Sequence, residues 1–269
     1  MDGTLAILGT GRMGEALLGG LLRSGWLAKD QVRCAVRTQD RANVLTAAHG
    51  VMATVDAAGA CATADVLLIA VKPQTIRALL EQIAPAVRPD HLVISVAAGV
   101  PTSVLEAALP DGVPVVRVMS NVPVQVDEAM SAISPGSHAG PEHVAVADAI
   151  LSHVGKVVHL AEEHLDAVTA LSGSGTAYFF LLAEAMIDAG ILLGLSRDVS
   201  TQLVIQTMVG SATMLRDSGR HPVELRESVT SPGGTTIAAI RVLDQERVRA
   251  AFLNAIEAAK FRATELAGG

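Results

Sequence analysis

The chain is poor in cysteine, aromatic residues and lysine, and these shortages exclude several classes of protein. Its two cysteines, Cys34 and Cys61, lie far apart and outside any CxxC or CxxH spacing, so we expect reduced packing residues in a cytosolic protein. The formal net charge is −7, and no basic patch is interleaved with aromatic residues. These features argue against a nucleic-acid partner.

Long apolar runs and a targeting leader are missing too. Runs such as Val66–Val71 are much shorter than the roughly 20 residues that cross a bilayer, and no basic segment precedes an apolar stretch at the N-terminus. We therefore expect a cytoplasmic protein with no membrane partner. A length of 269 residues suggests about two domains. Half of the residues are apolar but only 2% are aromatic, so we expect the cores to consist of Ala, Val, Leu and Ile.

Apolar segments alternate with helical patterns in the first part of the chain. A helix is predicted over Arg12–Ser24, and strands are predicted at Leu5–Leu8, Val32–Val36, Ala64–Val71, His91–Gly99, Val113–Met119, Glu128–Ser134 and Lys156–Leu160. Strands that are apolar throughout indicate a mainly parallel sheet covered on both faces.

The pattern becomes helical near Leu160. Helices are predicted over His164–Leu195, Asp198–Arg216, His221–Glu227, Thr235–Leu243 and Glu246–Leu266. The predicted fold class is therefore α/β: a Rossmann-type, doubly wound, mainly parallel sheet over residues 1–160, followed by an all-α dimerisation and substrate domain over residues 161–269.

One predicted helix segment, Ala177–Leu195, is apolar on nearly every side, with Glu184 and Asp188 as its only charges. A helix without a polar face is normally buried all round, and a bundle the size of residues 161–269 has little room to surround one. Two arrangements are open. A second chain completes the burial in an intertwined homodimer, or one central helix lies inside a monomeric bundle.

Three glycines follow the first predicted strand at the spacing G-x-G-x-x-G. In a dinucleotide site, Gly9 permits the tight turn, Gly11 lets a pyrophosphate approach the backbone, and Gly14 lets the helix pack close to the strand. The alternative is a purely structural turn. We predict cofactor contacts over the stretch Leu8, Gly9, Thr10, Gly11, Arg12, Met13 and Gly14, where helix N–H groups would bind the pyrophosphate.

The end of the second predicted strand indicates which cofactor binds. An acidic residue there would bind the ribose 2′-hydroxyl of NAD, but this chain has Arg37 and Thr38. A cation and a hydroxyl favour a 2′-phosphate and hence NADPH, with NADH as a second possibility; alternatively, Arg37 is a solvated surface residue. Further contacts are predicted at later strand ends, at Ala70, Val71, Lys72, Pro73, Ala97 and Ala98.

The stretch HLAEEH, His159–His164, resembles a metal motif only superficially. Its two histidines lie five residues apart, out of phase for one helical face, and the H-E-x-x-H spacing is absent. Acidic residues near a helix N-terminus explain the stretch better. We predict no metal site, and no Ser-His-Asp or Cys-His constellation can be argued from spacing.

Four motifs in order along the chain resemble the pyrroline-5-carboxylate reductase family, and the resemblance covers nearly the whole chain. They are GTGRMG from Gly9, AVKP from Ala70, GSGTAYFF from Gly173, and LRESVTSPGGTT, Leu225–Thr236, which is the most specific. RVMSNVP, Arg117–Pro123, also resembles the family, with Ser120 and Val122 in place of residues often seen as Pro and Thr; Thr176 likewise replaces a usual Pro. We include Asn121 of this stretch among the predicted cofactor contacts.

The resemblance implies an NAD(P)H-dependent reduction of the cyclic imine 1-pyrroline-5-carboxylate to L-proline, the last step of proline synthesis. It also implies a helical domain that interlocks with that of a partner chain, in dimers that often assemble into decamers. The implied substrate-binding residues are Val229, Ser231, Gly234, Thr235 and Thr236, and the hydroxyl of Thr236 faces the ring nitrogen as the catalytic group. The alternative is that Ser231 or Thr235 merely caps a helix.

Two other functions compete with this one. A 3-hydroxyacid dehydrogenase would need a base, usually a lysine in the second domain, but Lys260 is the only lysine after Lys156. The other competitor is a non-catalytic NADPH-binding sensor, which the departures at Ser120, Val122 and Thr176 leave open.

Overall fold

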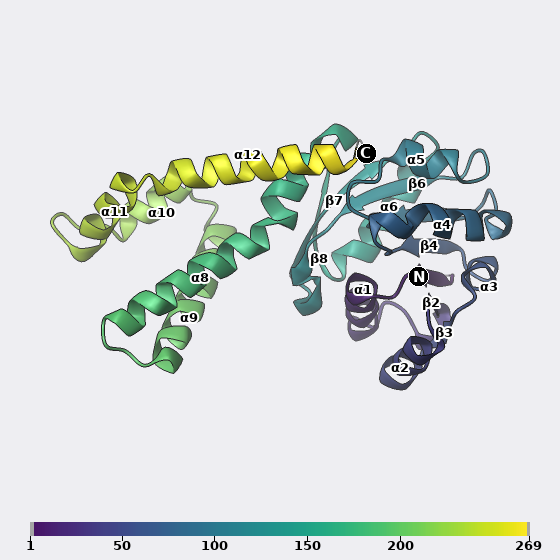
Figure 1. Ribbon diagram of the computed structural model, residues 1–269, viewed down its shortest axis with the longest axis horizontal. Coiled ribbons are helices and arrows are strands. Elements are labelled where there is room, and N and C mark those ends of the chain that lie inside the picture. Colours follow the sequence, from purple (N-terminus) through teal and green to yellow (C-terminus); the bar gives the residue numbers. More distant parts are fainter. Residues whose placement is uncertain (1–2, 268–269) are drawn as a thin grey trace. The chain divides into compact units, whose positions relative to one another are not determined.

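The computed structural model describes residues 3–267, which form two compact units (Figure 1). The first unit comprises the residues up to Ser174 together with those from Ala259 onward, and the second comprises Gly175–Ala258. The last strand ends at His159, and every later element is helical. Leu160 therefore marks a change of pattern, and a functional boundary there stays a prediction.

The first unit is built on an eight-stranded sheet in the order β3-β2-β1-β4-β5-β6-β7-β8. The strands are β1 (Leu5–Leu8), β2 (Val32–Ala35), β3 (Met52–Thr54), β4 (Val66–Ile69), β5 (Leu92–Ser95), β6 (Val115–Met119), β7 (Ala129–Pro135) and β8 (Gly155–His159). The neighbours from β3 to β6 are parallel, β7 is antiparallel to β6, and β8 is parallel to β7. The predicted mainly parallel sheet is confirmed. The sequence missed β3, whose three residues form no apolar run and leave Met52 58% exposed.

Helices cover both faces of this sheet. They are α1 (Arg12–Arg23), α2 (Gln39–His49), α3 (Ala57–Ala62), α4 (Pro73–Ile83), α5 (Thr102–Ala107), α6 (Pro141–Ser152) and the short α7 (Leu165–Val168). Alternate residues of β1 enter two apolar cores: Ile7 lies in the core that includes Leu17 of α1, and Leu8 lies in the one that includes Leu80 of α4. The central strands β1, β4 and β5 are thus buried on both sides, as a doubly wound fold requires, whereas β3 and β8 are partly exposed.

The two cysteines lie in different cores and are free, as the sequence predicts. Burial raises the pKa of Cys34 to about 11 and that of Cys61 to about 12. Both thiols therefore stay protonated at neutral pH, and they serve as small apolar packing groups.

The helical elements of the second unit begin with α8 (Gly175–Leu192), α9 (Arg197–Ser218), α10 (Pro222–Ser228) and α11 (Thr235–Gln245). The last helix, α12 (Val248–Ala267), ends in the first unit. The long helix predicted over His164–Leu195 corresponds to a helical run over Glu162–Leu192, in which a π-helical turn, Thr169–Gly173, lies between α7 and α8. This turn is held from outside the helix: the Asn121 amide donates to the Ser172 hydroxyl at 3.1 Å, and Gly173 lies against Met119.

Except for Gly175, no residue of α8 is buried by the described part of its own chain. Phe179, Phe180 and Leu181 are 62–67% exposed, and an apolar hollow of about 510 Å³ opens between α8 and α9. The helical run Glu162–Leu192 is also long and apolar enough, by length and composition, to cross a membrane. Contiguous exposed apolar surface of this extent indicates a partner.

Candidate functional site

The glycine-rich turn lies where the strand order of the sheet reverses. Strand β1 has β2 on one side and β4 on the other, and in open α/β sheets ligands bind outside the strand ends at such a point. Gly9 has φ +90°, and a Cβ there would overlap Val71. A Cβ on Gly14 would lie 3.0 Å from the Gly9 carbonyl oxygen and 3.3 Å from the Ala70 Cβ. Packing of the turn therefore requires Gly9 and Gly14.

Gly11 differs from the other two glycines. It is the N-cap of α1 and supplies no side-chain cap, and the nearest atom to a Cβ there would be the Gly9 oxygen at 3.9 Å. The Glu15 N–H bonds to the Gly11 oxygen at 2.8 Å, whereas the N–H groups of the first helical turn have no intrahelical acceptor. This open cradle of backbone donors fits the pyrophosphate of a dinucleotide.

Two further residues of the turn have different surroundings. The Thr10 side chain is buried and its hydroxyl donates to the Ile7 carbonyl at 3.1 Å, so Thr10 serves the turn itself. Arg12 is exposed at the start of α1 and Met13 is half-buried. Arg12 is thus free to approach a bound anion.

The predicted 2′-phosphate residues begin α2. Thr38 is its N-cap and accepts the Arg41 N–H at 3.4 Å, while Arg37 is exposed and has no hydrogen bond or ion pair within residues 3–267. The sequence missed Arg41, whose guanidinium pairs with Glu15 and donates to the Thr10 carbonyl. Burial raises the pKa of Glu15, but hydrogen bonds from Arg41 and His49 outweigh burial and lower it. Glu15 therefore stays ionised and links α2 to the glycine turn.

We expect Arg37→Ala to raise the KM for NADPH about tenfold and to leave the KM for NADH within twofold. Loss of one charge-assisted contact to a phosphate costs roughly 1.5–3 kcal/mol, and NADH lacks that phosphate. Steady-state assays with both cofactors measure the ratio. Equal weakening of the two cofactors would refute the 2′-phosphate role.

The residues predicted at the later strand ends differ in their exposure and hydrogen bonding. Lys72 is the exposed N-cap of α4 and Pro73 is its first residue, as expected for a strand exit. Ala97 is buried, whereas Ala98 is exposed and leaves room for a flat ring. The Asn121 amide is engaged by the chain itself, because its Oδ1 accepts the Met130 N–H at 2.9 Å and its nitrogen donates to Ser172. Asn121 thus holds the π-helical turn, and its contact with a cofactor stays a prediction.

The second candidate site is the loop between α10 and α11, which carries Val229, 60% exposed, at its start. Gly233 has φ +70°, and the Gly234 N–H bonds to the Ser231 carbonyl at 3.1 Å. Gly234 is the N-cap of α11 and no side chain caps this helix, so the capping alternative is not what the chain adopts. Within the described chain, the hydroxyls of Ser231, Thr235 and Thr236 have no hydrogen-bond partner, and the N–H groups of the first turn stay open.

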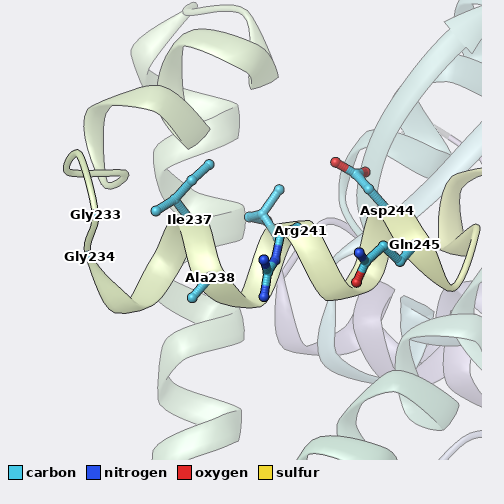
Figure 2. Close-up of a pocket in the computed structure, with 8 residues that line it drawn as sticks. Gly233, Gly234, Ile237, Ala238, Arg241, Asp244 and Gln245 are labelled. Atoms are coloured by element: carbon cyan, nitrogen blue, oxygen red, sulfur yellow. The ribbon is translucent and has the colours of Figure 1, made fainter.

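A hollow of about 800 Å³ extends from this loop along α11 (Figure 2). Its described lining residues come from the loop and from α11. The lining residues are Gly233, Gly234, Ile237, Ala238, Ile240, Arg241, Asp244 and Gln245. An uncapped helix start beside the apolar residues Ile237, Ala238 and Ile240 suits a small ring that carries one carboxylate.

The stretch HLAEEH has a structural role. Within residues 3–267, the side chains of its histidines make only long contacts, His159 with Asp148 at 3.7 Å and His164 with Glu163 at 3.7 Å, and Glu162 pairs with Arg117. Among residues 3–267, no three His, Cys, Asp or Glu side chains form a group that could hold a metal ion. Absence of a metal stays a prediction.

Comparison with known proteins gives two family profiles. One, described as pyrroline-5-carboxylate reductase dimerisation, matches residues 162–266. The other, described as NADP oxidoreductase, coenzyme F420-dependent, matches residues 4–99. They correspond to the helical part of the chain and to the first half of the sheet.

Several relatives that match nearly the whole chain are pyrroline-5-carboxylate reductases. A pyrroline-5-carboxylate reductase of Methanosarcina acetivorans is 41% identical over 262 residues, with 97% of each chain covered. One of Mycobacterium tuberculosis is 42% identical, with 97% of this chain and 96% of that one covered. The solved structure of a pyrroline-5-carboxylate reductase from Coxiella burnetii has a TM-score of 0.92 at 33% identity, over 99% of both chains. The Plasmodium falciparum pyrroline carboxylate reductase, solved with NADP bound, has a TM-score of 0.90 at 27% identity, over 99% of this chain and 98% of that one.

Proposed function

The chain belongs to the pyrroline-5-carboxylate reductase family, and we propose that it reduces 1-pyrroline-5-carboxylate to L-proline, the last step of proline synthesis, with NADPH as the preferred cofactor and NADH as an alternative. The observation that carries this proposal is the uncapped start of α11, with three unengaged hydroxyls and no acid, base or nucleophile in its loop. This set of groups suits a reaction in which the cofactor supplies the chemistry and the protein binds and orients the substrate.

Different residues of the first unit are proposed to bind different parts of the cofactor. The open N-terminus of α1 behind Gly11 binds the pyrophosphate, Arg37 and Thr38 hold the 2′-phosphate, and Ala98 lies against the nicotinamide. Gly9 and Gly14 bind no ligand with side chains and only shape the turn. NADPH, when bound, supplies the hydride that goes to the imine carbon.

The substrate residues bind one end of a small ring. The N–H groups behind Gly234, together with the Ser231 and Thr235 hydroxyls, hold the carboxylate. The imine takes one proton from water to form the iminium, and hydride addition to the carbon then leaves the ring nitrogen as an amine, whose developing lone pair accepts a hydrogen bond from the Thr236 hydroxyl. Because an iminium is already electrophilic, a strong general acid is not essential, and near-attack placement of the ring is the main contribution of the protein.

The proposal is tested by following NADPH absorbance with the imine as substrate. Oxidation of NADPH with production of proline is the expected result. Oxidation with a 3-keto acid but not with the imine would favour a 3-hydroxyacid dehydrogenase, for which Lys260 is the remaining candidate base. Cofactor binding without turnover of any imine would favour a sensor.

A second copy of this chain covers the exposed apolar surface of the helical unit. Phe180, Ile187 and Ile205 line the open hollow between α8 and α9, and no described residue of the same chain covers it. The match of residues 162–266 to a dimerisation family supports a homodimer as the basic unit. In the proposed assembly, these dimers associate further into a decamer. We place the enzyme in the cytoplasm, with no membrane or nucleic-acid partner. This is consistent with two free, buried thiols, which a reducing compartment preserves.

We expect light scattering after size exclusion to give a dimer or a multiple of it at micromolar concentration. Phe180→Glu would place a charge in the interface and weaken association at least about a hundredfold, roughly 3 kcal/mol. Met52→Glu, at an exposed apolar residue of the sheet unit, is the matched control and should leave the mass unchanged. A monomeric native protein would contradict the homodimer, and partition into membranes would show that a bilayer covers α8.

A further inference from the structure

An arginine that the sequence patterns did not single out lies beside the glycine turn, within the first unit. The Arg41 Nη2 donates to the Thr10 carbonyl at 3.4 Å and pairs with the Glu15 carboxylate. Both contacts use the same nitrogen, so within residues 3–267 the N–H groups of Nε and Nη1 have no acceptor. The guanidinium of Arg41 therefore keeps donors that a ligand can use.

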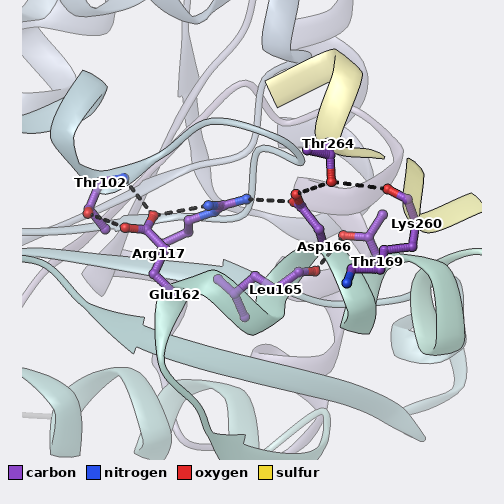
Figure 3. Close-up of polar contacts among 8 residues, drawn as sticks. All are labelled: Thr102, Arg117, Glu162, Leu165, Asp166, Thr169, Lys260 and Thr264. Atoms are coloured by element: carbon purple, nitrogen blue, oxygen red, sulfur yellow. Dashed lines mark hydrogen bonds and ion pairs between the residues drawn. The ribbon is translucent and has the colours of Figure 1, made fainter. Parts of the chain in front are cut away.

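A buried arginine of the same unit provides a comparison. The Arg117 side chain is only 7% exposed; it pairs with Glu162 at 3.0 Å and lies 4.0 Å from Asp166 (Figure 3). The Arg41 side chain is 34% exposed, and Glu15 is its carboxylate partner in the described chain. Arg117 is enclosed by anions of its own chain, as a structural cation must be, whereas Arg41 leaves part of its guanidinium open to solvent.

Glu15 holds this arginine from α1. Its Oε2 pairs with Arg41 and its Oε1 lies 3.2 Å from His49 Nε2, so both carboxylate oxygens are engaged by residues of α2. Although burial raises the pKa of Glu15, these two contacts outweigh burial and lower it, so the carboxylate stays ionised at neutral pH. A long side chain held in one orientation loses less conformational entropy when it binds a ligand.

The location of Arg41 matches the predicted 2′-phosphate site. Its own N–H donates to the hydroxyl of Thr38, the N-cap of α2, at 3.4 Å. The Thr10 N–H bonds to the Ala35 carbonyl at 3.2 Å, which joins the glycine turn to the end of β2. The ribose of a dinucleotide binds at this strand end, and an arginine nearby accommodates a 2′-phosphate. The remaining donors of Arg41 are therefore attached at the turn and the strand end that would face the phosphate.

We propose that Glu15 and Arg41 form a selectivity pair: Glu15 orients Arg41, and the remaining N–H groups of Arg41 bind the 2′-phosphate of NADPH together with Arg37. This inference rests on the proposed NADPH preference and adds two residues to it. NADH lacks the phosphate, so its binding does not depend on the pair. A pair that only docked α2 onto α1 would instead change stability and would affect both cofactors alike.

Titration calorimetry with NADP⁺ and NAD⁺ measures this selectivity without turnover. We expect Arg41→Met to raise the Kd for NADP⁺ about tenfold and to leave the Kd for NAD⁺ within about twofold. Arg41→Lys keeps the charge but not the planar fork, and should recover part of the affinity. Arg23→Met removes an exposed pair with Asp127, 2.8 Å long, at the other end of α1. It is the matched control and should change neither Kd.

A substitution at Glu15 separates orientation from simple repulsion, because the two mechanisms predict opposite signs. Glu15→Met removes the charge and the acceptor but keeps the length of the side chain. If Glu15 orients Arg41, this variant should raise the Kd for NADP⁺ at least about threefold. If Glu15 were only a negative charge near a phosphate, its removal would tighten NADP⁺ binding. Tighter or unchanged binding of NADP⁺ would therefore overturn the orienting role.

The native protein and the Arg41 variants separate this inference from the proposed function. A native protein that binds NADP⁺ no tighter than NAD⁺ would overturn the NADPH preference and the inference with it. Native selectivity that survives Arg41→Met would overturn the inference alone and leave Arg37 to bind the phosphate. A thermal melt without cofactor completes the test, since a lower Tm with equal weakening of both cofactors would assign the pair to the docking of α2 onto α1.

Discussion

We expect Gly11→Val to abolish tight NADPH binding while the enzyme remains folded. A Cβ at this position would meet no atom closer than 3.9 Å, and its backbone, with φ −83° and ψ −154°, is open to any L-residue. The added methyl groups would instead occupy the space in front of the α1 N–H groups. Loss of two charge-assisted bonds to the pyrophosphate costs about 3 kcal/mol or more, which is a Kd raised about a hundredfold.

A substitution at Gly9 should affect stability, in contrast to the effect on binding expected at Gly11. Gly9→Ala would force a Cβ into Val71 at φ +90°, so this variant should lose stability first. Calorimetric titration with NADPH and a thermal melt separate the two effects. Gly11→Ala should weaken binding less than Gly11→Val, with Tm within about 2 °C of native for both. A Gly11→Val enzyme with native affinity would place the pyrophosphate elsewhere.

The sequence predicted the local elements well because their signals are local. Leu5–Leu8 is β1 as predicted, and the helix predicted over Asp198–Arg216 is α9 with both ends shifted by one or two residues. Apolar continuity, turn glycines and helical periodicity act over a few residues and survive in the folded chain. The three-residue β3 lacks such a signal, since its pairing with β2 and not its composition makes it a strand.

The sequence patterns could not predict contacts between segments that are distant along the chain. Periodicity predicts a helix through residues 169–173, but Asn121, from another element, holds Ser172 in a π-helical turn. Glu162 appears in the sequence as an acid near a helix start, and only the fold shows that it caps α5 from sixty residues away. For the same reason Arg41 was missed, because its partners Glu15 and Thr10 lie on a different element.

We expect Thr236→Val to lower kcat/KM for the imine between tenfold and a hundredfold, about 1.5–3 kcal/mol, with NADPH affinity unchanged. Thr236 is half-buried in the first turn of α11, and its hydroxyl has no partner within the described residues. Valine keeps the shape and removes only the hydroxyl. In the proposed reaction, the ring nitrogen then loses its hydrogen-bond donor as it becomes an amine.

Two neighbouring hydroxyls make this experiment specific. Thr235→Val should act through the carboxylate and raise the KM for the imine, whereas loss at Thr236 should fall mainly on kcat. Thr230→Val is the matched control in the same loop, because the Thr230 hydroxyl donates to the Arg226 carbonyl at 2.6 Å and faces no ligand in the proposed site. Thr236→Ser should restore most of the rate. If Thr236→Val and Thr230→Val both retained native kcat/KM, the nitrogen would take its hydrogen bond from another group, and the α11 loop would act on the carboxylate alone.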